Sequence, residues 1–269
     1  MMRRKLTYSI KEVTPYINWA YYFYAWQVKD KAGQERLRDE AMMFLDRWAH
    51  RYGVYALFML GTANSDGDDI RFDGVTIPML RQQHPDARCG VCLSLADFIR
   101  PLSGGRPDRM GIFATTVDMG LETDFAADEY QNMTARLLAT RLAEAAAELL
   151  HEQVRRRYWG YAPDEQLSMD ELHAEKFAGI RPAVGYPSLP DMGINFVLND
   201  IIRFSDIGIK LTENGAMIPH ASVSGLMMAH PAARYFSVGR IGGDQLADYA
   251  RRRGVPKAVI RKFLIANIE

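Results

Sequence analysis

Residues 179–191 have the sequence GIRPAVGYPSLPD, which holds three prolines, two glycines, one arginine and one tyrosine in thirteen positions. Two of the prolines restrict the residues that precede them, Arg181 and Tyr186, to extended backbone. Gly185 permits a backbone conformation that other residues rarely adopt. A simple turn needs fewer such residues, so we expect a rigid loop that presents Arg181 and Tyr186.

Two interpretations of this loop fit its residue types. The planar guanidinium of Arg181 matches the two oxygens of a carboxylate, and a stiff loop loses less entropy when a ligand binds. The loop could therefore hold a small carboxylate ligand. Alternatively, it is a proline-stiffened surface loop whose arginine caps the end of a helix. The residue types alone favour neither interpretation.

The bulk composition describes a globular chain that can bury a sizeable core. It has 269 residues, 48% of them hydrophobic, with 33 basic and 33 acidic side chains. No apolar run is long enough to span a bilayer, and the N-terminus lacks the apolar stretch of a secretory signal. The balanced charge gives no reason to expect nucleic acid as a partner. We expect a cytoplasmic protein with no nucleic-acid or membrane partner.

Hydrophobic periodicity predicts helices and strands that are largely segregated along the chain. Helices are expected at 16–26, 35–52 (ended by Gly53), 128–160, 195–209, 242–254 and 256–268, and at a capping box formed by Ser168 and Glu171. Strands are expected at 54–60, 70–73, 109–117 and 233–241, with broken strand character over 210–230. Because the strands come as hairpins, the pattern predicts an α+β fold rather than alternating βαβ units.

Other short motifs lack the neighbours that their chemistry requires. The only cysteines, Cys89 and Cys92, form a lone C-x-x-C without a second ligand pair, so we interpret them as reduced thiols. The glycines of 239–243 fit a strand-to-helix turn better than a dinucleotide site. The acidic stretch 66–70 is too short for a calcium loop of the EF-hand type.

Several long stretches resemble one protein family in order along nearly the whole chain. GIRPAVGYP (179–187) resembles the signature loop of the activation domain of cobalamin-dependent methionine synthase. The other matching stretches are VTPYINWAYYFYAW (13–26), RQQ (81–83), LADF (95–98), RLAEAAAELLHEQVRRRYWGYAPDEQLS (141–168), LTENGAMIPHASVSG (211–225), HPAARYF (230–236) and DQLADYARRRG (244–254).

The resemblance implies a curved antiparallel sheet with surrounding helices, formed by residues 1–269 as a single domain. It implies binding of S-adenosylmethionine and docking over a cobalamin that has been oxidised to its inactive state. A flavodoxin-like donor supplies an electron, and S-adenosylmethionine supplies the methyl group. In the family this domain is the C-terminal quarter of a longer enzyme. We expect a stand-alone chain here, which meets cobalamin only through a partner protein and is not a complete methionine synthase by itself.

The resemblance also implies a set of binding residues. Arg181 should contact the carboxylate of S-adenosylmethionine, and Gly185 and Tyr186 should shape the same loop. Tyr235, with Phe236 beside it, should line the pocket. Asn18 should lie near the amino group or the sulfonium. We assign no catalytic residue and no metal ligand to this chain.

Three departures from the family pattern concern the chemistry more than the fold. Asn18 replaces an aspartate that binds S-adenosylmethionine. Residues 192–195, Met-Gly-Ile-Asn, replace a histidine-threonine-glutamate-lysine run. Thr123 and Thr140 stand where two acids receive the displaced histidine ligand of the cobalt.

Three functions therefore remain in view. The first is an S-adenosylmethionine-binding reactivation component that acts on a separate corrinoid protein in a methyltransferase system. The second is a diverged binding or regulatory module without methyl transfer. The third is a structural subunit without a ligand.

Overall fold

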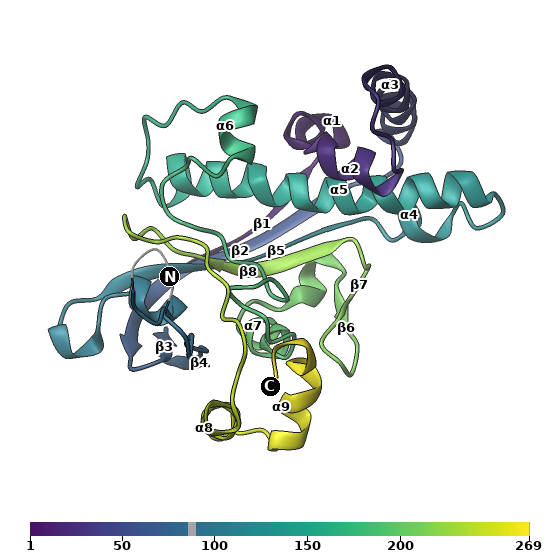
Figure 1. Ribbon diagram of the computed structural model, residues 1–269. Coiled ribbons are helices and arrows are strands. Elements are labelled where there is room, and N and C mark those ends of the chain that lie inside the picture. Colours follow the sequence, from purple (N-terminus) through teal and green to yellow (C-terminus); the bar gives the residue numbers. More distant parts are fainter. Residues whose placement is uncertain (86–89, 269) are drawn as a thin grey trace.

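A curled, six-stranded antiparallel sheet forms the centre of the molecule in the computed structural model, which describes residues 1–85 and 90–268 (Figure 1). Strand β2 is the longest. One of its sides pairs with β5, and the other pairs first with β1 and then with β3. Strand β4 extends the sheet beyond β3, and β8 extends it beyond β5. The bounds are β1 Met2–Tyr8, β2 Val54–Asp66, β3 Asp69–Phe72, β4 Val75–Pro78, β5 Asp108–Val117 and β8 Ser222–Met227.

Both faces of this sheet are covered, as the residue pattern of β2 requires. Leu57 and Met59 pack into a hydrophobic core on one face, and Phe58 and Leu60 pack into a second core on the other. Successive side chains of a strand point to opposite faces, so a strand buried on both sides is apolar without interruption. The continuous run VYALFML in β2 has this character.

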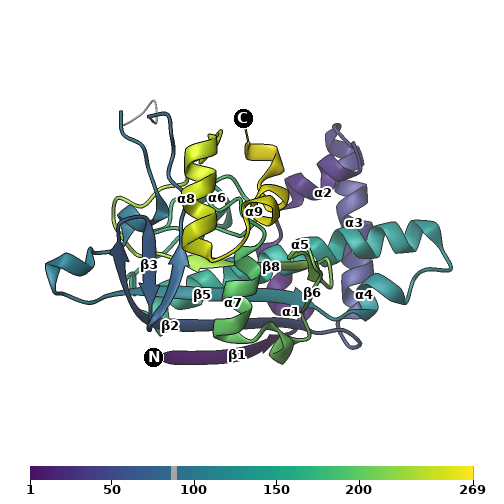
Figure 2. The same cartoon turned by 90° about the horizontal axis from the view of Figure 1, so that it is seen from below.

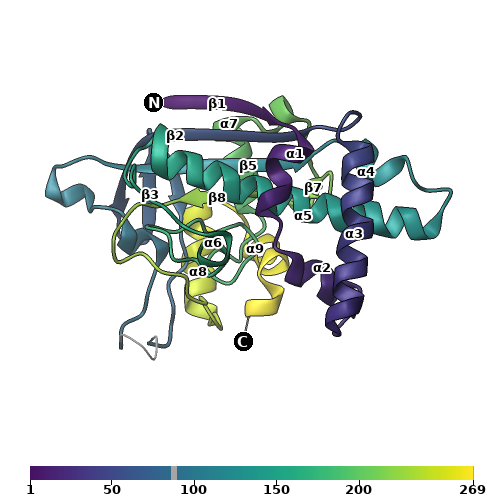
Figure 3. The ribbon, with the colours of Figure 1, turned by 90° about the horizontal axis from the view of Figure 1, so that it is seen from above.

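Helices from the first two thirds of the chain cover one face (Figure 3). The long helix α5 lies over the strands, and its Ala139, Ala143, Ala146 and Ala147 are fully buried because small side chains allow a close approach. Asp128 caps its first turn, and a π-helical turn at Val154–Tyr158 follows its end. The helices on this side are α1 Ile10–Val13, α2 Trp19–Ala25, α3 Lys31–Trp48, α4 Gly120–Thr123, α5 Glu129–Gln153 and α6 Met169–His173.

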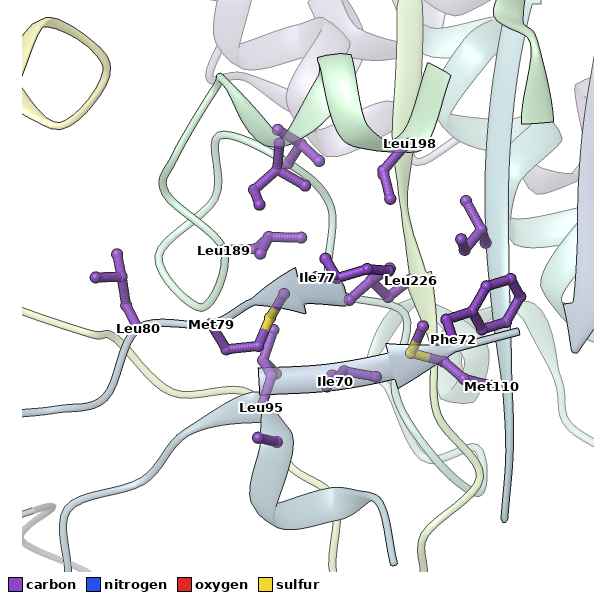
Figure 4. Packing of buried hydrophobic residues seen from close by; sticks show 14 of the residues in the cluster. Ile70, Phe72, Ile77, Met79, Leu80, Leu95, Met110, Leu189, Leu198 and Leu226 are labelled. Carbon is purple, nitrogen blue, oxygen red and sulfur yellow. The ribbon is translucent and has the colours of Figure 1, made fainter. Parts of the chain in front are cut away.

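The C-terminal third of the chain covers the opposite face (Figure 2). Leu198 of α7 (Ile194–Ile202), Leu226 of β8 and Ile77 of β4 meet in the core on this face (Figure 4). The elements on this side are α7 Ile194–Ile202, α8 Gly243–Arg253, α9 Lys257–Phe263 and a small hairpin of β6 Lys210–Leu211 and β7 Met217–Ile218.

The α+β class and the curved antiparallel sheet are confirmed, whereas several predicted elements were wrong in detail. The predicted helical face from residue 16 to 26 is split, because Asn18 is extended and α2 begins after it. Helix α3 ends at Trp48, before Gly53. Residues 233–241 form no strand, since they lie against the proline loop, whose prolines cannot donate ladder hydrogen bonds. Strand β1 was not predicted.

Cys89 lies outside the described residues, so the C-x-x-C interpretation is not addressed by the structure. Within the described part of the chain, no helix combines the length and apolar character that crossing a membrane would require.

Candidate functional site

The proline loop at residues 179–191 lies along the outer edge of β8. Backbone hydrogen bonds join Ile180 with Met228 in both directions, at 2.9 and 3.0 Å, and Val184 N–H donates to Ser224 O at 2.9 Å. Leu226 N–H donates to Pro182 O at 3.0 Å. Gly225 permits this approach, because a Cβ there would lie 2.2 Å from Pro182 O. The loop is rigid because the sheet holds its main chain.

This pairing gives the loop the alternation of a strand. Ile180 and Val184 pack into the core on the α7 side of the sheet, whereas Arg181 and Ala183 line a pocket on the α5 side. Leu189, further along the loop, is also buried in that core (Figure 4). The position of Arg181 therefore follows from the packing of its neighbours.

The pocket has a volume of about 550 Å³, a size typical of small-molecule sites. Its walls come from the start of α2, the middle of α5, the end of α6, the proline loop, and Tyr235 with Phe236. Five of the six residues expected from the sequence line it: Asn18, Arg181, Tyr186, Tyr235 and Phe236. Segments far apart in the sequence thus converge on one cavity.

Arg181 is buried, with 8% of its side chain exposed, and already has a carboxylate partner. Its Nη2 donates to Glu148 Oε1 of α5 at 2.5 Å, and its guanidinium lies 5.5 Å from the ring centroid of Phe113. Among the described residues, Arg181 Nε and Glu148 Oε2 have no hydrogen-bond partner. Arg181 does not cap a helix end. A ligand carboxylate would have to share the guanidinium with Glu148 and could not form a bidentate pair with both of its terminal nitrogens.

Two tyrosines and a serine fix the loop around this arginine. Tyr235 Oη accepts from the backbone N–H of Arg181 at 2.9 Å, and burial raises the pKa of Tyr235 to about 12. Tyr186 Oη donates to Glu144 Oε1 of α5 at 2.7 Å. Ser188 Oγ donates to Phe236 O at 2.5 Å and accepts from Phe236 N–H at 3.1 Å. The loop and residues 235–236 therefore form one unit.

Acidic side chains outnumber the arginines in this pocket. Glu144, Glu148 and Glu175 line it together with Arg141 and Arg181. The pKa of Glu175 is raised, first by burial and then by the charge of Glu148. Glu175 also has a φ of 57°, in the left-handed region that glycine favours, and such outliers often mark functional positions. With three carboxylates against two guanidinium groups, this arrangement favours a ligand that carries more positive than negative charge.

Asn18 has a structural task at the pocket wall. It is the N-cap of α2, and its Oδ1 accepts from Ala20 N–H at 3.2 Å. Aspartate caps helices as well as asparagine does, so the family's aspartate would fit the same backbone. The difference between the two residues is therefore one of charge at the pocket wall.

The other sequence candidates lie outside the pocket lining. Gly185, with a φ of 87°, closes the turn of the loop, and a Cβ there would come within 2.8 Å of Met192 Sδ. Residues 192–195 lie on the opposite side of the sheet, where Asn195 is buried and accepts from Ser224 Oγ at 2.5 Å. The Thr123 and Thr140 hydroxyls each donate to a carbonyl one turn earlier in the chain.

Sequence reasoning missed the glutamates of this pocket. Arg141, Glu144 and Glu148 are spaced three and four apart in a helix otherwise rich in alanine, a spacing that places them on one face. That signal was available in the sequence. Glu175 had no such signal, because its place depends on how α6 and the segment after it pack beside α5.

Comparison with known proteins agrees with this fold. The family model described as "Vitamin B12 dependent methionine synthase, activation domain" matches residues 9–254. Among solved structures, the chain is similar to one described as "Crystal Structure of the MetH Reactivation Domain bound to AdoHcy", with 35% sequence identity and a TM-score of 0.93. The match covers 100% of this chain and 90% of that chain.

Proposed function

Because the chain belongs to the family of activation domains of vitamin B12-dependent methionine synthases, we propose that its pocket binds S-adenosylmethionine. The observation that carries this proposal is the convergence of Arg181, Tyr235 and three glutamates on one cavity of about 550 Å³. The similar solved structure, whose title records bound AdoHcy, supports a ligand of this class.

The charges of the pocket fit this ligand. S-adenosylmethionine carries an ammonium and a sulfonium against one carboxylate, so it is a net cation, whereas its demethylated product is neutral overall. Arg181 would hold the carboxylate, and the excess of glutamates would favour the two cationic groups. We expect S-adenosylmethionine to bind more tightly than its product, and the difference to shrink as salt is added.

We further propose that residues 1–269 act as one domain on cobalamin held by a partner, either a corrinoid protein or the other modules of a methionine synthase. When bound, S-adenosylmethionine supplies the methyl group for cobalt that a flavodoxin-like donor has reduced. This chain's own residues bind and orient the methyl donor. The second candidate, a regulatory module that binds the ligand without methyl transfer, is favoured by the neutral Asn18 at the pocket wall.

Calorimetric titration with S-adenosylmethionine tests the binding proposal. Arg181→Ala should cost about 2–5 kcal/mol of binding free energy, part of it from leaving a carboxylate unpaired. Arg181→Lys keeps a charge beside Glu148 and so protects the fold. The lysine ammonium lacks the planar fork of donors with which the guanidinium can bind Glu148 and a ligand carboxylate at once. The affinity for S-adenosylmethionine should therefore fall at least about tenfold.

Arg155, in the π-helical turn that follows α5, offers a matched control. It is fully buried and pairs with Glu165, but it does not line the pocket. Arg155→Lys should leave the affinity unchanged. Wild-type affinity in Arg181→Lys, or an equal loss in both lysine variants, would remove Arg181 from the binding site. Binding without methylation of a partner's cobalamin would favour the regulatory module.

A further inference from the structure

A second, smaller cavity lies next to the first pocket, and one aromatic residue of each lining contacts the other. Its volume is about 320 Å³, and its walls include Phe98, Arg100, Asp108, Arg109, Trp159 and His230. The ring of Phe98 lies edge-on to Phe236, which lines the first pocket, with 6.3 Å between centroids. The binding proposal above does not use this cavity.

The two arginines of this cavity lack anionic partners. Within the described residues, neither the Arg100 nor the Arg109 guanidinium makes an ion pair or a hydrogen bond. Other arginines do form ion pairs with carboxylates, for example Arg81, Arg155 and Arg252. The side chains of Arg100 and Arg109 are both exposed. The lining holds two guanidinium groups against the single carboxylate of Asp108, so it carries an excess of positive charge that favours an anion.

The acid within the cavity is already engaged with main-chain groups. Asp108 Oδ2 accepts from Arg100 N–H at 2.9 Å, and Asp108 Oδ1 accepts from Arg109 N–H at 2.8 Å. One carboxylate thus fixes the backbones of both arginines. Asn64 Nδ2 adds a hydrogen bond to Arg100 O at 3.1 Å. The main chain from which both arginine side chains extend is therefore held in place.

The remaining wall supplies a third donor and flat apolar surface. His230 Nδ1 accepts from Ala232 N–H at 3.1 Å, so the neutral ring carries its proton on Nε2 as a donor. The ring of Trp159 is half-buried and is held edge-on by Tyr161, with 5.1 Å between centroids. Donors and an indole face together suit an anion attached to a flat ring.

We propose that this cavity binds a small organic anion, with its phosphate or carboxylate on Arg100 and Arg109 and its flat ring against Trp159. None of these residues lines the first pocket, so binding in the second cavity does not depend on the proposed function.

Phenyl phosphate is the probe for a calorimetric test on the full chain. It should bind saturably in the millimolar range or below, more tightly than inorganic phosphate, and phenol should not bind detectably. Arg100→Gln and Arg109→Gln should each weaken phenyl phosphate at least about tenfold. Arg106→Gln is the matched control, because Arg106 is an exposed neighbour outside the cavity lining, and it should have no effect.

Two further variants make the test specific. Trp159→Leu should weaken phenyl phosphate but leave inorganic phosphate unchanged. Arg181→Lys should leave both unchanged, which excludes binding of the probe in the first pocket. The proposal is overturned if wild type gives no saturable binding, or if Arg106→Gln weakens the probe as much as Arg109→Gln does, because diffuse attraction would then explain the result.

Discussion

Two clusters on opposite faces of the sheet each combine an arginine, a carboxylate and a tyrosine, but their surroundings differ. On the α5 side, Arg181 pairs with Glu148 and its backbone is held by Tyr235. On the α8 side, Arg253 Nε lies 3.4 Å from Asp191 Oδ2. The same oxygen accepts a hydrogen bond from Tyr249 Oη at 2.7 Å. Burial and the neighbouring Asp191 raise the pKa of Tyr249 well above its ordinary value.

The difference between the clusters is access. Asp191 is 1% exposed and its other oxygen accepts from Gly193 N–H at 2.7 Å, so this acid is fully used within the protein. Glu148 is 21% exposed and, like Arg181, lines a cavity. A buried ion pair with a tyrosine is therefore not a sign of a binding site by itself. It becomes one when the pair forms the wall of a pocket.

Asp191→Ala should have the largest effect, and it should act on stability alone. The substitution leaves Arg253 buried without its carboxylate, which costs about 3–5 kcal/mol in comparable cases. Urea unfolding measures the loss, and the affinity of the folded protein for S-adenosylmethionine should not change. Asp46→Ala, at an exposed ion pair with Lys11, is the control and should cost less than about 1 kcal/mol. A changed affinity in Asp191→Ala would mean that the two clusters are coupled through the sheet.

Gly225→Ala should come next and should affect both properties. The added Cβ would collide with Pro182 O and push the loop off β8, with a cost of about 1–3 kcal/mol in stability. Because Arg181 moves with the loop, binding should weaken as well. Gly243→Ala, at the start of α8, serves as the control, because its added Cβ would meet Lys257 Nζ at an unstrained 4.0 Å. Loss of stability without loss of binding would show that the loop does not need β8 to position Arg181.

Asn18→Asp should tighten binding by roughly 1 kcal/mol, because it adds a negative charge beside a cationic ligand. Aspartate preserves the N-cap of α2, so the unfolding free energy should stay the same. Calorimetry of the two proteins at equal salt measures the difference. Weaker binding in the aspartate variant would place Asn18 beside the ligand's carboxylate instead of its cationic groups.

Glu175→Gln should have the smallest effect, below about 1 kcal/mol, because the side chain is only partly buried and solvent screens its charge. Its pKa in the folded protein is raised above 4.5, so the folded state binds this proton more tightly than the unfolded chain does. The contribution of Glu175 to stability is therefore present at pH values below 4.5 and is lost as the pH rises from 4.5 through the raised pKa of the folded protein. Protonation also removes its attraction for a cation, so wild-type affinity should fall as the pH is lowered toward the raised pKa.

Titrations across this pH range, on wild type and Glu175→Gln, check the prediction. The variant should bind more weakly near neutral pH and lose part of the pH dependence. Glu35→Gln, at an exposed position of α3, should match wild type. An unchanged pH profile in Glu175→Gln would assign the dependence to another group.

The sequence predicted the class of the fold and the rigidity of the loop, because both depend on local residue types. The strand prediction at 233–241 failed for a tertiary reason, since this apolar segment pairs with a loop in which Pro187 and Pro190 cannot donate hydrogen bonds. The MRRKLTY segment of β1 is too charged to show a strand pattern, and its pairing with β2 determines its structure. Likewise, no spacing rule could pair Arg181 with Glu148, since the two meet only after α5 packs on the sheet.

The position of the proline loop on β8 has a consequence for self-association. Strand β8 is almost entirely buried, and without the loop its outer edge would offer free backbone groups to another chain. Edges of this kind promote aggregation, and prolines are among the residues that block it. The loop that presents Arg181 therefore also covers the outer edge of β8 and keeps other chains from pairing with it. Substitutions that loosen it should lower solubility together with ligand affinity, so a damaged pocket should be visible as oligomers in light scattering.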